Sequence, residues 1–120
     1  MRRTAIIFLL GVSFTSCYYD KEDLLYPAGN CDTTGVTYSG TVATALQGNS
    51  CMSCHSGGAP SGNISLEGYN NVRTVALNGK LLGTISHTGG FAPMPQGGPK
   101  MNECTINKIR AWINAGAPNN

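Results

Sequence analysis

The sequence predicts an all-α domain of three to four helices joined by long loops rich in glycine and proline. Apolar residues recur at helical spacing in three segments. No strand-like run of Val and Ile precedes Cys51, and residues 56–62 and 86–100 carry too much Gly and Pro for a regular element. In a chain of 120 residues, these elements leave room for one small domain, which we place at residues 31–120.

The first helix is expected between Tyr38 and Asn49. Ser39 is the expected N-cap, and Gly48 is the expected stop. The apolar residues of this segment recur at helical spacing: Val42, Ala45 and Leu46.

The second helix is expected from Leu66 to Leu77, because its apolar residues lie on overlapping turns. Ser65 can cap its start, and Asn78 with Gly79 should end it.

The third helix should begin at Asn102 or Glu103 and run to Ala115, before Gly116 and Pro118. One apolar stripe follows its length: Ile106, Ile109, Trp112 and Ile113.

The N-terminus has the pattern of an export signal. Arg2 and Arg3 precede a short apolar run at residues 5–14, which is too short for a permanent membrane helix. The run ends in Phe14-Thr15-Ser16-Cys17, which resembles a bacterial lipoprotein box. The resemblance implies that residues 1–16 are removed, that Cys17 carries lipid, and that residues 17–30 form a tether. The protein would then be anchored in the periplasm or on the outer membrane of a Gram-negative bacterium.

The strongest functional signal is the sequence Cys51-Met52-Ser53-Cys54-His55, a C-x-x-C-H motif. On a helical turn its two thiols and its imidazole can face one bound object, as in the covalent attachment of a c-type haem. The thiols would form thioethers with the haem, and His55 would be the proximal iron ligand. The alternatives are a zinc site, a dithiol redox motif, a chance occurrence, or a Cys51–Cys54 disulfide in an adhesion domain.

Two further cysteines, Cys31 and Cys104, are left when Cys17 is assigned to lipid and the motif to haem. An exported protein can form disulfides, and a bridge between distant residues stabilises a domain with a small core. We therefore expect a Cys31–Cys104 disulfide, with two buried free thiols as the alternative.

The order of motif, loops and helices resembles that of small monohaem c-type cytochromes of the mitochondrial-like class, over about residues 31–118. The resemblance implies one haem c and a late methionine as sixth iron ligand. Ala92-Pro93-Met94-Pro95 matches that pattern, and the flanking prolines would hold Met94 on a stiff segment. The alternatives are His87, Met101 or an open site. The resemblance also implies that a proline carbonyl, here that of Pro60, orients His55.

These observations predict a tethered single-electron carrier that is not an enzyme. Its partners would be redox proteins and, through the lipid on Cys17, a membrane. Nucleic acid is not expected, since loss of Arg2 and Arg3 leaves basic and acidic residues balanced. The alternative is a haem enzyme, or a sensor of gas or peroxide, with an open sixth site.

Overall fold

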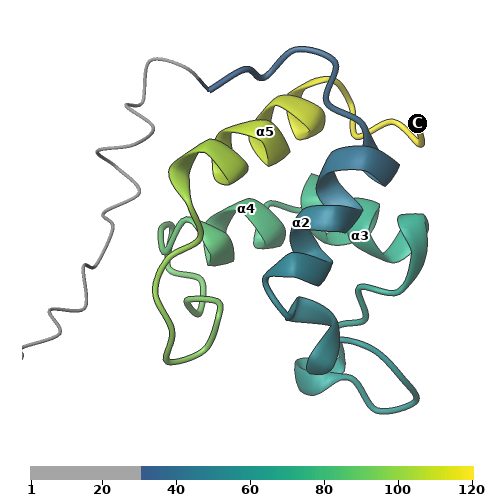
Figure 1. Cartoon of the computed structure of the whole chain (residues 1–120). Coiled ribbons are helices and arrows are strands. Elements are labelled where there is room, and N and C mark those ends of the chain that lie inside the picture. Colours follow the sequence, from purple (N-terminus) through teal and green to yellow (C-terminus); the bar gives the residue numbers. More distant parts are fainter. Residues whose placement is uncertain (1–30) are drawn as a thin grey trace, which may run out of the picture.

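The computed structural model describes residues 31–120, and that part of the chain is helical without strands. The predicted signal peptide, Cys17 and the tether lie outside the described residues. Residues 31–120 form four α-helices, which are labelled in Figure 1. They are α2 (Ala43–Gly48), α3 (Gly68–Leu77), α4 (Lys80–Ile85) and α5 (Glu103–Asn114). Within residues 31–120, none of them has the length and hydropathy that a membrane span requires.

The first predicted helix is present, but it starts as one turn of π-helix, η2 (Tyr38–Val42), which continues into α2. Its N-cap is Thr37, not Ser39. Thr37 is the last extended residue before the helix, and its hydroxyl accepts a hydrogen bond from the Gly40 amide at 3.1 Å. Ser39 lies inside the first turn, and its hydroxyl donates to the Asn120 carbonyl at 2.9 Å.

The second predicted helix is α3, which begins at Gly68 and not at Leu66. The chain at Leu66 is held elsewhere, because its amide donates to the His55 carbonyl at 2.8 Å. Ser65 does not cap the helix; its hydroxyl accepts from the Glu67 amide at 3.2 Å, in the turn before α3.

The six-residue helix α4 was not expected from the sequence. Asn78 and Gly79 do end α3, but Gly79 has a φ of +81°, which turns the chain directly into a new helix. The Asn78 side chain accepts from the Lys80 amide at 3.0 Å, and Leu81 and Ile85 enter the core.

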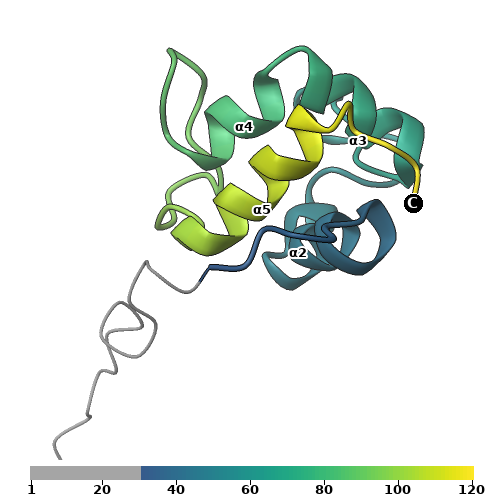
Figure 2. The same cartoon turned by 90° about the horizontal axis from the view of Figure 1, so that it is seen from above.

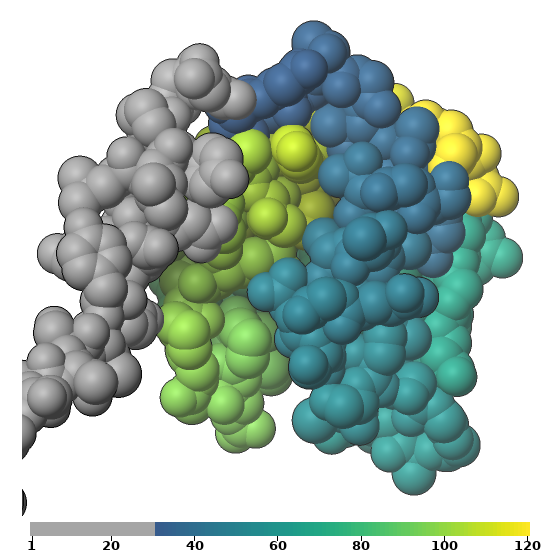
Figure 3. Space-filling model, in the orientation of Figure 1, coloured from purple at the N-terminus to yellow at the C-terminus, as the bar shows by residue number. Residues whose placement is uncertain are grey.

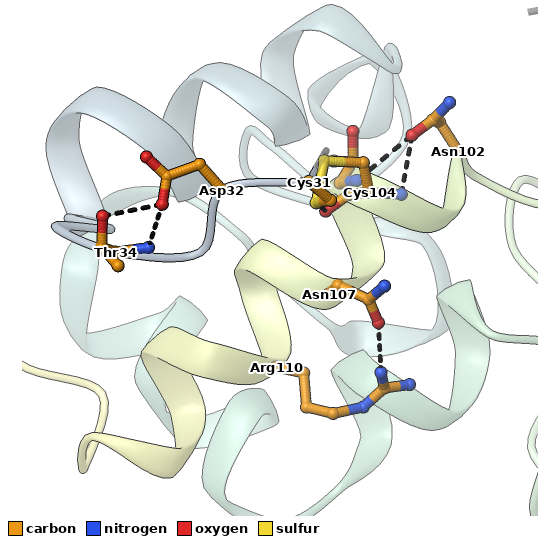
Figure 4. The surroundings of a disulfide bond; sticks show 8 residues. Cys31, Asp32, Thr34, Asn102, Cys104, Asn107 and Arg110 are labelled. Atoms are coloured by element: carbon orange, nitrogen blue, oxygen red, sulfur yellow. Dashed lines mark hydrogen bonds between the residues drawn. A yellow bond between two sulfur atoms is a disulfide. The ribbon is translucent and has the colours of Figure 1, made fainter. Parts of the chain in front are cut away.

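The third predicted helix is α5, with Asn102 as its N-cap. The Asn102 side chain accepts from the amides of Cys104 at 2.8 Å and Thr105 at 3.3 Å. Next to this cap, Cys104 forms the expected disulfide with Cys31 (Figure 4). The bridge ties the start of the described chain to the first turn of α5.

The core lies where α5 crosses between η2–α2 on one side and α4 on the other (Figure 2). Trp112 is 1 % exposed at its centre, and its indole N–H donates to the Pro118 carbonyl at 2.9 Å. The buried apolar side chains come from all four α-helices and from four positions outside them: Val42, Leu46, Leu66, Val72, Val75, Ala76, Leu81, Ile85, Met101, Ile106, Ile109, Trp112 and Ala117.

Candidate functional site

A cavity of about 390 Å³ brings the C-x-x-C-H motif and Met94 together. It opens between the segment near residues 50–60 and the loop 86–100, where Figure 3 shows the surface hollowed. Cys51, Cys54, His55 and Met94 all line it. The sequence separates the motif from Met94 by about forty residues, so the fold, and not local spacing, makes them one site.

The walls of the cavity are mostly apolar. They come from α2, α3, α4 and the chain before α3: Leu46, Ile64, Leu66, Val75, Leu81 and Ile85. Polar side chains such as Lys80 and Gln96 also contribute to the lining. Such a pocket suits a largely apolar group with a few polar contacts.

The two thiols of the motif belong to a single turn. Cys51 starts the short 3₁₀-helix η3 (Cys51–Ser53), and its carbonyl accepts from the amides of Cys54 at 3.3 Å and His55 at 3.0 Å. Both thiols are free, so the structure does not contain a Cys51–Cys54 disulfide. Cys51 is half-buried, and this burial raises the pKa of its thiol, while Cys54 is exposed.

The imidazole of His55 is held in one tautomer. Its Nδ1 lies 2.9 Å from the carbonyl oxygen of Ile64. A carbonyl can only accept, so Nδ1 carries a proton, and in the neutral imidazole Nε2 keeps a free lone pair. His55 is therefore prepared to bind a metal through Nε2.

The carbonyl that orients His55 belongs to Ile64, not to Pro60 as expected. The Pro60 carbonyl accepts from the Asn63 amide at 3.0 Å, because it closes the short turn η4 (Ser61–Asn63). Two backbone bonds bring Ile64 beside the imidazole. The Ser61 amide donates to the Cys54 carbonyl and the Leu66 amide to the His55 carbonyl, both at 2.8 Å.

Of the three side chains considered as sixth ligand, Met94 lines the cavity and the other two do not. Met101 is 4 % exposed and packs in the core. His87 points its Nε2 at the carbonyl oxygen of Met94, 3.1 Å away.

Within residues 31–120, no group of three or more His, Cys, Asp and Glu side chains is close enough to hold a metal ion by itself. A structural zinc site takes four such ligands. In this part of the chain, Cys31 and Cys104 are joined to each other and do not approach the motif as ligands.

No family model, no curated protein and no solved structure matches this chain.

Proposed function

We propose that this protein is a single-electron carrier with one covalently attached haem c, ligated by His55 and Met94. One observation supports the proposal most. Two free thiols, an imidazole with a free Nε2 and a thioether line one mostly apolar cavity. This donor set is the one that a c-type haem with histidine and methionine ligands requires.

Four residues would bind the haem, two through its edge and two through its iron. Cys51 and Cys54 would form the two thioether links, while His55 and Met94 would bind the iron. When bound, the haem supplies an iron that changes reversibly between the ferrous and ferric states.

The protein's own part is to hold these ligands still and to keep water away. The Ile64 carbonyl fixes the ring of His55, and the apolar walls would limit the access of water to a bound haem. With His55 and Met94 both bound to the iron, no ligand would need to enter or leave between the two oxidation states. This arrangement favours electron transfer over catalysis. A thioether ligand also raises the reduction potential relative to a second imidazole.

The partners we propose are a redox donor and a redox acceptor, both proteins. Cys54 lines the cavity and is exposed. The haem edge linked to it would therefore be accessible to a partner that docks through a small, transient interface. A lipid on Cys17 would confine the search for partners to a membrane surface of the cell envelope. Mass spectrometry of the mature N-terminus tests the anchor, and an unmodified Cys17 would remove it from the proposal.

Covalent attachment is tested first, on the full chain exported from a host that matures c-type cytochromes. A denaturing gel stained for haem should show a band at the mass of the mature protein, since non-covalent haem is lost on denaturation. The double variant C51S/C54S should lose the band. The matched control is Ser53→Ala, which changes an exposed residue of the same motif and should keep it. A wild-type protein that does not stain would refute the proposal.

The ferric spectrum then separates the carrier from its alternative. A low-spin haem with the weak long-wavelength band of an iron–sulfur bond supports electron transfer. A high-spin haem that binds cyanide at once would instead indicate an enzyme or a sensor with an open sixth site.

A further inference from the structure

The loop that carries Met94 has an unusual contact at its start. His87 has a φ of +55°, a left-handed conformation in which His is tolerated better than most residues. Its Nε2 lies 3.1 Å from the carbonyl oxygen of Met94. Because that oxygen can only accept, Nε2 donates the hydrogen bond.

The Met94 amide is held as well, from the opposite side of the residue. It donates to the carbonyl oxygen of Thr84 at 3.0 Å, and the same oxygen accepts from the His87 amide at 3.3 Å. The N–H and the C=O of Met94 are thus both fixed, the first by α4 directly and the second through the ring of His87.

The Thr84 carbonyl that accepts these two amide bonds belongs to a packed helix. Thr84 lies in α4 between the buried residues Leu81 and Ile85, and its hydroxyl donates to the Leu81 carbonyl at 2.9 Å. α4 in turn contacts α3 and α5. Met94 is therefore connected to the core through α4.

We propose that His87 is a positioning residue: it holds the Met94 carbonyl and so keeps the Met94 thioether at the wall of the cavity. The inference rests on the proposed function for its consequence at the iron, and it assigns His87 a role other than that of rival ligand. The ring of His87 already donates a hydrogen bond to the Met94 carbonyl, and His87 does not line the cavity.

The hydrogen bond matters because the chain around Met94 forms no helix or strand. Residues 86–100 contain Gly89, Gly90, Gly97 and Gly98, and a methionine side chain has three rotatable bonds. Fixing the main chain at Met94 limits where its sulfur can reach. Loss of one net hydrogen bond should raise the population of the displaced segment by about tenfold.

The test compares His87→Leu with His87→Gln. A glutamine amide can reach the position of Nε2 and donate to the same carbonyl, whereas leucine cannot. Both replacements carry the same backbone strain at φ +55°, so their difference isolates the hydrogen bond. Thr88→Ala is the control in the same loop, because Thr88 is exposed and its side chain forms no hydrogen bond within residues 31–120.

Two readouts are used on the full protein as purified. The first is the apparent affinity of the ferric protein for cyanide, which binds where Met94 has left the iron. His87→Leu should raise it about tenfold and weaken the long-wavelength iron–sulfur band, while His87→Gln and Thr88→Ala should match the wild type. The second is hydrogen exchange of the Met94 amide, which should be about tenfold faster in His87→Leu alone and which does not depend on haem.

The outcomes distinguish the two proposals. Equal cyanide affinity and equal exchange in His87→Leu and His87→Gln would overturn the role of His87. A wild-type protein without covalent haem would overturn the proposed function. Faster exchange confined to His87→Leu in that protein would still support the positioning role.

Discussion

At the scale of single residues, the site distinguishes two methionines that the sequence alone leaves as rivals. Met94 is partly exposed and lines the cavity, and Met101 is buried among core residues. Met94→Ala should therefore abolish the iron–sulfur band of the ferric protein. The proposed haem should stay attached, since its attachment would depend on Cys51 and Cys54. Optical spectra together with a haem stain measure both.

Met101 provides the complementary variant. Met101→Ala should keep the band but lower the free energy of unfolding by about 2–5 kcal/mol, the usual cost of such a core truncation. Met101→Leu should recover most of that loss. Urea unfolding measures the stability, and loss of the band in folded Met101→Leu would contradict the assignment of Met94.

The orienting carbonyl of His55 shows what single residues in a sequence cannot reveal. The thiols and the imidazole were predictable because their chemistry depends on side chains at fixed spacing. The hydrogen bond from Nδ1 goes to a main-chain oxygen, which every residue possesses. Nothing in the side chain of Ile64 marks it, and the family resemblance points instead to Pro60, whose carbonyl closes η4.

At the scale of elements, three helices were predictable from their apolar stripes and α4 was not. In α4 the buried residues Leu81 and Ile85 are a single i, i+4 pair, too short a repeat to show a period. Asn78 and Gly79 also read as a stop for α3, and the same turn starts α4. The element missed is the one that supplies Thr84, the anchor of the loop that carries Met94.

A second contact between α4 and this loop leads to a prediction. The ring of Phe91, 37 % exposed, lies against Gly83, and a Cβ at Gly83 would overlap it. Helix propensity alone would favour Gly83→Ala by about 1 kcal/mol. We expect the reverse sign, with a loss of about 1–3 kcal/mol in the free energy of unfolding, because the new methyl group must displace the ring. Urea unfolding measures it.

The matching double-mutant cycle uses Phe91→Ala. In that background Gly83→Ala should become neutral or stabilising, because the ring that it would meet is gone. If Gly83→Ala were equally destabilising with and without Phe91, the contact would not be the cause.

At the scale of the whole molecule, the disulfide that links distant parts of the chain is not part of the candidate site. The Cys31–Cys104 bridge lies at the start of α5, and neither cysteine lines the cavity. The sequence separation of 73 residues means that the bridge encloses η2, α2, α3, α4 and both long loops. It thus restricts the unfolded chain over most of the domain without touching the proposed ligands.

The double variant C31S/C104S should lower the free energy of unfolding by about 2–4 kcal/mol, because the unfolded chain regains the freedom that the bridge removes. Urea unfolding of the two proteins measures the difference. The ferric spectrum at temperatures where both are folded is the control, and it should be unchanged, since neither bridged cysteine lines the cavity. A loss of the iron–sulfur band in the folded variant would show that the bridge supports the site directly. A free energy of unfolding within about 0.5 kcal/mol of the wild type would show that the packed helices already restrain the chain.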